Sequence, residues 1–80
     1  MPYITVTAAD GCLVNGKTTV IHYSVGTTLR LILSYAEEDG RTVKEWVIYD
    51  LDGVEIARFQ PTEIYALNNP GSYFVSPTFN

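Results

Sequence analysis

The chain has 80 residues, enough for one domain and near the lower limit for a core that folds without disulfides or metal ions. Its single cysteine excludes an internal disulfide, and 46% apolar residues predict one globular domain over residues 1–80. The net charge is −4, and the five basic side chains are scattered, so the chain lacks the basic stripe that nucleic acid or an anionic membrane requires. No apolar run approaches the roughly 20 residues of a membrane helix. We therefore predict no nucleic-acid partner and no membrane insertion.

Turn signals divide the chain into short runs that are rich in β-branched and aromatic residues. These signals are Asp10-Gly11, Asn15-Gly16, Asp39-Gly40, Asp52-Gly53 and Asn69-Pro70-Gly71. Between them the side chains alternate with a period of two, which is typical of β-strands. This rhythm predicts an all-β domain, either a small antiparallel sheet sandwich or a partly open barrel of six to seven short strands.

In chain order, we predict strands at residues 3–8, 18–25, 28–35, 43–50, 54–59, 63–67 and 73–79. The first places Ile4, Val6 and Ala8 on one side. The third places Leu29, Leu31, Leu33 and Tyr35 on one face and Thr28, Arg30, Ile32 and Ser34 on the other. The second places Ile21, Tyr23 and Val25 on one face and Thr18, Val20, His22 and Ser24 on the other. For residues 61–68, a single helical turn is the alternative to the predicted strand at 63–67. Pro77 is expected to place the last strand at a sheet edge or to interrupt it.

The segment Trp46 to Ile56 allows two hairpin registers. A two-residue loop at Asp52-Gly53 sets Asp50 against Glu55, which would be favourable only around a cation, with Asp52 close by. A three-residue loop at 51–53, with Gly53 left-handed, instead pairs Tyr49 with Glu55. In that register Ile48 faces Ile56, Val47 faces Ala57, and Trp46 faces Arg58, which stacks on the indole ring. We favour the turn, keep Asp50, Asp52 and Glu55 as candidate metal ligands, and expect no cofactor.

Catalytic chemistry has little support in this sequence. His22 is the only histidine and Cys12 the only thiol, so a zinc site with several such ligands cannot form, although a single Cys-His contact can. We expect a solvent-facing or partly covered His22, and a Cys12 that is either packed or available for intermolecular linkage. No serine lies in a nucleophile-elbow pattern. The protein is predicted not to be an enzyme.

Aromatic residues offer the main route to a ligand. The chain has six Tyr, one Trp and three Phe, more than a thin sheet can point inward. We therefore name Tyr49, Tyr65 and Tyr73 as candidate binding residues for a protein or glycan ligand. Exposed sheet edges, expected at the first and last strands, provide a second route through strand addition.

The stretch VTAADGCLVNGKTTVIHYSVGTTLRLILSYAEEDGRTVKEW resembles internalin-type B-repeat modules of bacterial surface proteins. The likeness rests on a first strand, a Gly-bearing turn, the residues Tyr23, Val25-Gly26-Thr27-Thr28 and Leu29, an acidic Gly turn and a strand that ends in Trp46. The closing YFVSPTF looks like the final strand of such a module. This resemblance implies a repeat or spacer module of a larger exported protein.

A second resemblance stays open. EWVIYDLDGVEI followed by TEIYALNNPGSYFV is similar to strands of bacterial immunoglobulin-like or PKD-type domains, with Trp46 as core tryptophan and Tyr73 as the tyrosine-corner residue. Both families imply a non-catalytic spacer, adhesion or binding module at the cell surface or outside the cell. The alternative is a small stand-alone inhibitor or assembly protein, phage-encoded in one version, that binds a protein through an edge strand or aromatic face. That alternative is cytoplasmic if Met1 is a native start.

Overall fold

The computed structural model describes residues 2–23 and 28–80. Within these residues it contains strands and no helix, so the predicted all-β fold class is confirmed. The strands are β1 (Tyr3–Ala8), β2 (Cys12–Val14), β3 (Thr19–Tyr23), β4 (Leu29–Leu31), β5 (Leu33–Tyr35), β6 (Val43–Tyr49), β7 (Glu55–Phe59), β8 (Tyr65–Leu67) and β9 (Gly71–Phe79). In the described part of the chain, no helix is long and apolar enough to cross a membrane.

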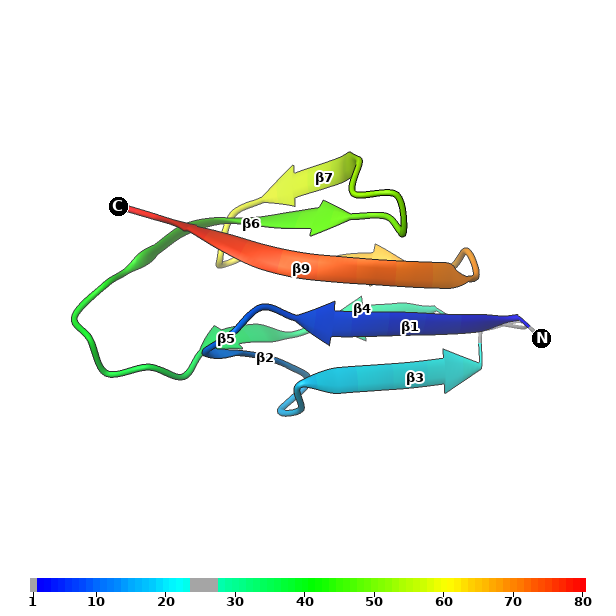
Figure 1. The fold of residues 1–80 in the computed structure, drawn as a ribbon, viewed down its shortest axis with the longest axis horizontal. Coiled ribbons are helices and arrows are strands. Elements are labelled where there is room, and N and C mark those ends of the chain that lie inside the picture. The colour runs from blue at the N-terminus through cyan, green and yellow to red at the C-terminus, as the bar shows by residue number, and fades with distance from the viewer. Residues whose placement is uncertain (1, 24–27) are drawn as a thin grey trace.

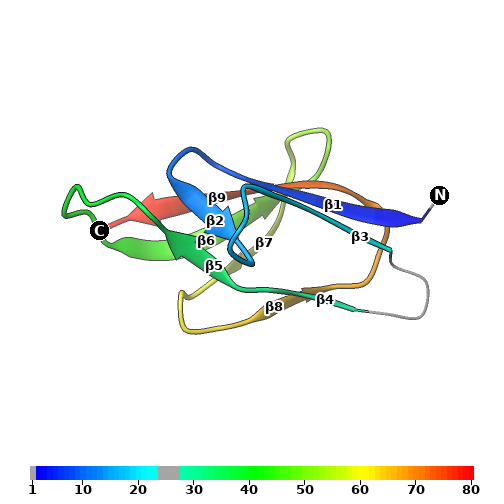
Figure 2. The same cartoon turned by 90° about the horizontal axis from the view of Figure 1, so that it is seen from below.

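Five strands form the main sheet, in the order β3-β1-β9-β6-β7 (Figure 1). β1 and β9 run parallel, with Ile4 opposite Gly71 and Ala8 opposite Val75, whereas the other neighbours in this sheet are antiparallel. The remaining strands form two short antiparallel pairs, β2 with β5 and β4 with β8. Figure 2 shows the β4–β8 pair set apart from the main sheet. The domain is therefore a sandwich whose second layer consists of two small pieces.

The number and directions of the strands differ from the prediction. The described residues form nine strands rather than six or seven, β2 was not predicted, and the β1–β9 pair is parallel. The predicted strand at 28–35 is divided at Ile32, because the backbone N–H and carbonyl groups of Ile32 form hydrogen bonds with Asn15. The Asn15 N–H donates to the Ile32 carbonyl oxygen at 2.8 Å, and the Ile32 N–H donates to Asn15 Oδ1 at 2.7 Å. The alternation itself survives, since Leu29 and Leu31 are buried while Ile32 is exposed.

The segment with a helical alternative forms a turn followed by a strand. The Glu63 N–H donates to the Gln60 carbonyl oxygen, and the Gln60 N–H donates to a Glu63 carboxylate oxygen, both at 3.0 Å. These two bonds close a tight turn, after which β8 pairs with β4. The strand prediction at 63–67 is thus confirmed in its second half.

Strand β9 lies in the middle of the main sheet, so the predicted edge position or interruption at Pro77 is wrong. β9 exchanges neighbours along its length, because residues 71–75 pair with β1 and residues 74–79 pair with β6. Pro77 lies beyond the last β1 pair, opposite Trp46, and has a neighbouring strand on one side only. A residue without an N–H donor is tolerated at such a position. The edges of the main sheet are β3 and β7, not the first and last strands.

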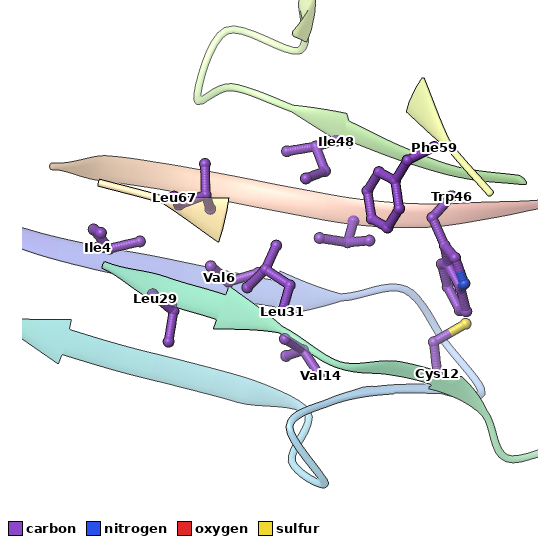
Figure 3. Packing of buried hydrophobic residues seen from close by; sticks show 11 residues of the cluster. Ile4, Val6, Cys12, Val14, Leu29, Leu31, Trp46, Ile48, Phe59 and Leu67 are labelled. Carbon is purple, nitrogen blue, oxygen red and sulfur yellow. The ribbon is translucent and has the colours of Figure 1, made fainter. Parts of the chain in front are cut away.

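The core lies between the two layers (Figure 3). Its buried apolar side chains come from both layers and are Ile4, Val6, Cys12, Val14, Leu29, Leu31, Trp46, Ile48, Phe59, Leu67 and Val75. Figure 3 shows the Cys12 sulfur beside the Trp46 ring. Burial raises the pKa of the Cys12 thiol, and only 2% of the residue is exposed, which favours the packed interpretation over intermolecular linkage.

Strand β3 faces the opposite way from the apolar pattern of the sequence. Ile21 and Tyr23, the large residues of its apolar face, are 68% and 51% exposed. Val20 and His22 are half-buried instead, opposite Val6 and Ile4 of β1. His22 is partly covered, as predicted, but its side chain lies on the inner side of the main sheet. Ser24 and Val25 of the same predicted strand lie outside the described residues.

Arg41 fastens the segment between β5 and β6 to one end of the sandwich. Its guanidinium carbon lies 4.2 Å from the Phe79 ring centroid, and its Nη2 donates to the Tyr35 hydroxyl at 2.7 Å. Its Nε pairs with Asp39 Oδ2 at 2.7 Å. The Tyr35 hydroxyl also donates to the Asp39 carboxylate. The hydrogen bond from Tyr35, followed by the Arg41 backbone N–H, lowers the pKa of Asp39 to about 2.

Truncation of the core is predicted to destabilise the domain strongly. Ile48 is fully buried, so Ile48→Ala should lower the free energy of unfolding by about 2–5 kcal/mol, the range for such cavities. Ile21→Ala is the matched control, because Ile21 is exposed, and should cost about 0.5 kcal/mol or less. Urea unfolding, followed by the fluorescence of Trp46, measures both. Equal losses in the two variants would contradict the assignment of β3.

The contacts of Asp39 predict a pH-dependent contribution to stability. Because the folded-state pKa is lowered to about 2, this contribution is present above the ordinary aspartate value and is lost as the pH falls from about 4 to about 2. Asp39→Asn should lower the melting temperature at neutral pH, and the gap from wild type should close across that window. Glu38→Gln removes a neighbouring charge without touching the Asp39 contacts and serves as control. A difference in melting temperature between Asp39→Asn and wild type that stays unchanged down to pH 2 would contradict the prediction.

Candidate functional site

The outward face of the main sheet is the candidate site, and we call it the outer face. Ile4 and Val6 point into the core, so Thr5 and Thr7, which alternate with them, point outward. The register of the sheet places the outward residues of the other strands beside them. The outer face consists of Tyr3, Thr5, Thr7, Thr19, Ile21, Tyr23, Ser72, Phe74, Ser76, Thr78, Glu45, Val47, Tyr49 and Arg58.

One corner of the outer face is apolar. Tyr3 of β1 stands opposite Tyr23 of the edge strand β3, and their rings meet edge to face with centroids 5.5 Å apart. Ile21, two residues from Tyr23 on the same side of β3, extends this apolar corner. Tyr3, Ile21 and Tyr23 are all exposed. Aromatic rings that remain in contact with water while packed against each other are typical of surfaces that bind protein or sugar.

The opposite side of the outer face carries ion pairs between charged side chains. Arg58 of β7 donates from Nη2 to Glu55 Oε1 at 2.8 Å, and its Nη1 lies 3.5 Å from Glu45 Oε1. The hydrogen bond from Arg58 lowers the pKa of Glu55, and the same pair raises the pKa of Arg58. Val47 lies between Arg58 and Ser76 in the sheet and is buried even though it points outward. On this side of the outer face the charged side chains of Arg58 and Glu55, and not Val47, are therefore exposed to solvent.

A hollow of about 290 Å³ opens between these two regions. It is lined by Thr7, Ser72, Tyr73 and Phe74 of the sheet and by Asp50 and Leu51 of the β6–β7 loop. Figure 2 shows this loop rising on the side of the sheet that faces away from β4 and β8. Phe74 is 42% exposed and Leu51 is 81% exposed, so the hollow has apolar walls and hydroxyl groups from Thr7 and Ser72. It has the dimensions and mixed polarity suited to a side chain or one sugar ring.

Asp50 shapes the β6–β7 loop through its own carboxylate. Asp50 Oδ1 accepts hydrogen bonds from the N–H groups of Asp52 and Val54, both at 2.9 Å. The Gly53 N–H donates to the Asp50 carbonyl oxygen at 3.0 Å, and Gly53 has φ of +80°. This is the predicted three-residue loop at 51–53 with a left-handed glycine. Among residues 2–23 and 28–80, no group of three or more His, Cys, Asp or Glu is placed to hold a metal ion.

The predicted pairing beyond this loop is wrong after its first pair. Tyr49 does lie opposite Glu55, but a bulge follows, and Ile48 then pairs with Ala57, Val47 with Arg58 and Trp46 with Phe59. The extra residue in β7 moves every later pair by one position. Arg58 therefore does not stack on Trp46. Trp46 is instead buried in the core, and the arginine that lies over an aromatic ring is Arg41.

The three candidate binding tyrosines do not form one surface. Tyr49 lies on the outer face, half-buried beside Phe74 and opposite Glu55. Tyr65 stacks on Phe59 with centroids 5.4 Å apart and packs against the core. Tyr73 also packs against the core, and its hydroxyl donates to the Asn69 carbonyl oxygen at 2.9 Å, closing the turn before β9. Only Tyr49 is on the outer face, and Tyr73 borders the hollow while holding a turn in place.

Ile21, Tyr23 and Phe74 were not predicted as binding residues from the sequence, whereas two residues that line the hollow, Tyr73 and Asp50, were candidates for a ligand and for a metal ion. Ile21 and Tyr23 belonged to the apolar side of their predicted strand, and Phe74 lay within the predicted last strand. A period of two defines two faces for each strand and leaves open which face is inside. The one available signal was the strong inward pattern of β1, because any strand paired with Thr5 and Thr7 must share their outward side.

Comparisons with protein-family models, with curated proteins and with solved structures found no match.

The loop geometry predicts how Asp50 and Asp52 respond to substitution. Asp50→Ala removes an acceptor used by two backbone donors and should lower the free energy of unfolding by about 1–2 kcal/mol. Asp50→Asn keeps an acceptor oxygen and should retain part of that stability. Asp52→Ala should change stability by about 0.5 kcal/mol or less. Thermal melts with and without calcium test the alternative, since a stabilisation by sub-millimolar calcium that Asp50→Ala abolishes would establish a cation site.

Proposed function

We propose that this domain is a non-catalytic spacer module of a larger bacterial cell-surface or secreted protein. The observation that carries the proposal is the parallel pairing of β1 and β9. β1 begins at one end of the long axis and β9 ends at the other (Figure 1). The principal extents are 40 × 23 × 21 Å, so a chain that passes through the domain advances along its longest dimension. A module with this arrangement separates whatever precedes it from whatever follows it.

The chemistry of the side chains supports a role without catalysis. The sequence holds one histidine and one cysteine, and that cysteine is buried beside Trp46. The two carboxylates with a lowered pKa already have hydrogen-bond partners. Asp39 accepts hydrogen bonds from Tyr35 and Arg41, and Glu55 accepts them from Arg58. The B-repeat and immunoglobulin-like resemblances, which imply exported repeat modules, agree with this role. Under the proposal the parent protein is exported.

A second candidate function is a small protein-binding module that acts through the apolar corner. The observation in its favour is the exposure of Tyr3, Ile21 and Tyr23 at the edge of the main sheet. Wild type and an Ile21→Thr/Tyr23→Thr variant can be compared on a panel of immobilised glycans and extracellular proteins. A ligand that binds wild type and not the folded variant supports this function. Equal binding to both, or no binding at all, removes it.

The spacer function predicts the shape of tandem copies. Two and three copies joined directly should give particles whose maximum dimension, from small-angle X-ray scattering, grows by up to 40 Å for each added copy. The physical reason is that each copy receives the chain at one end and releases it at the other. A control with a flexible glycine-serine linker shows how much of the length depends on direct joining. Tandem copies that fold back side by side, with a maximum dimension close to one copy, would contradict the proposal.

A further inference from the structure

We propose that the domain is a mechanical clamp, in which the β1–β9 and β1–β3 ladders resist a pull applied through the two chain ends. A spacer in a surface protein transmits load, so a biological role for the clamp rests on the proposed spacer function. The clamp itself follows from the strand register alone.

The direction of the load follows from the parallel register. A pull on the N-terminal end draws β1 from its Tyr3 end, and a pull on the C-terminal end draws β9 from its Phe79 end. Figure 1 places these two ends toward opposite ends of the long axis, with β1 and β9 side by side between them. The pull therefore acts along the strands and slides one past the other. All pairs from Ile4↔Gly71 to Ala8↔Val75 are loaded together.

Strand β1 is held on both sides against this sliding. On one side it pairs with β9, and on the other it pairs with β3 from Tyr3↔Tyr23 to Thr7↔Thr19. The backbone donors alternate between the two neighbours. The N–H of Ala8, the last residue of β1, donates to the Thr18 carbonyl oxygen, and the N–H of Ala9, which follows β1, donates to the Val75 carbonyl oxygen, both at 2.9 Å. Extraction of β1 therefore requires two ladders to shear at once. Its buried side chains Ile4 and Val6 would leave the core in the same step.

Strand β9 is anchored independently of β1. From Phe74 to Phe79 it pairs with β6, and this stretch continues beyond the last residue of β1. Arg41 lies over the Phe79 ring at the end of this stretch, and the Asn80 N–H donates to the Thr42 carbonyl oxygen at 3.0 Å. The C-terminal end of the load path is thus tied to the rest of the sheet. The β1–β9 and β1–β3 ladders are then the first to be sheared.

Shear and peeling differ in how many hydrogen bonds break together. A single hydrogen bond contributes little net free energy, so bonds that break one after another offer little resistance. Bonds loaded together must fail in a single step, which raises the barrier that governs forced unfolding. The clamp therefore depends on the direction of the pull, and this dependence separates it from simple thermodynamic stability.

The test compares two pulling directions on the same chain by single-molecule force spectroscopy. In a Cys12→Ala background, one version carries handles at the N-terminus and the C-terminus. The other carries them at the N-terminus and at Ser72→Cys, an exposed residue opposite Thr5 near the start of the β1–β9 ladder. The first direction shears the ladders and the second peels the β1–β9 pair apart. We expect a several-fold higher unfolding force for the end-to-end pull at the same pulling speed, and equal forces would overturn the clamp.

A pair of proline variants locates the resistance. By the alternation of donors along β1, the Thr7 N–H points toward β9, so Thr7→Pro removes a donor from the clamp. Ile56→Pro disturbs the edge strand β7, outside the load path, and is the matched control. Urea unfolding measures the stability of each. Thr7→Pro should lose most of the difference between the two pulling directions and Ile56→Pro should keep it. Loss in both variants, or in neither, counts against the clamp.

If Thr7→Pro does not fold, the two pulling directions on the parent chain still decide the question. The outcome is separable from the spacer proposal. Extended tandem copies with equal forces in both directions would remove the clamp and leave the spacer. Direction-dependent forces with folded-back tandem copies would remove the spacer and leave the clamp.

Discussion

The parallel pairing of β1 with β9 is the constraint on which the rest of this structure depends. It joins strands from opposite ends of the sequence, so forming the pair closes a loop that contains most of the chain and costs the entropy of that closure. Once formed, it places β9 at the centre of the sheet and leaves β3 and β7 as the edges. It also sets the two chain ends apart along the long axis. Topology, outer face and load path all follow from this one contact.

The outer face illustrates how a small domain uses a sheet with only one covered side. The inner side is closed by the β4–β8 and β2–β5 pairs, which supply Leu29, Leu31, Leu67, Cys12 and Val14 to the core. On the outer side, the Arg58 ion pairs cover one part and hydroxyl residues occupy the middle. The apolar corner at β1 and β3 stays open to solvent. The proposed protein-binding function depends on this corner, where exposed aromatic side chains lie at an antiparallel sheet edge.

Two acidic residues of this chain, Asp50 and Asp39, hold local structure in place. Asp50 accepts two backbone N–H groups within its own loop, and Asp39 binds Tyr35 and Arg41 at the end of the sandwich. A carboxylate satisfied in this way stabilises a turn or a loop. The same reasoning applies to Asn15, whose left-handed backbone and amide hold Ile32 between β4 and β5.

The sequence by itself determined the fold class, the inward alternation of β1, β4 and β5, and the three-residue loop at 51–53. Each of these depends on residues close together in the chain, such as Asp50 with Gly53, and local chemistry is enough to predict it. The resemblance to surface-protein repeats and the non-catalytic role remain predictions. Of the candidate site, the sequence named Tyr49 on the outer face and Tyr73 beside the hollow as binding residues and missed Ile21, Tyr23 and Phe74.

Only the tertiary structure decided which side of β3 is inside, where the β7 bulge lies, and that β1 and β9 run parallel. A two-residue period marks two faces without ranking them, and Val20 and His22 became the inner pair because β1 presents Ile4 and Val6 opposite them. One extra residue in β7 moved Arg58 away from Trp46, although the loop itself was predicted correctly. Strand partners far apart in sequence are chosen by the packing of the whole core. No local pattern carries that information.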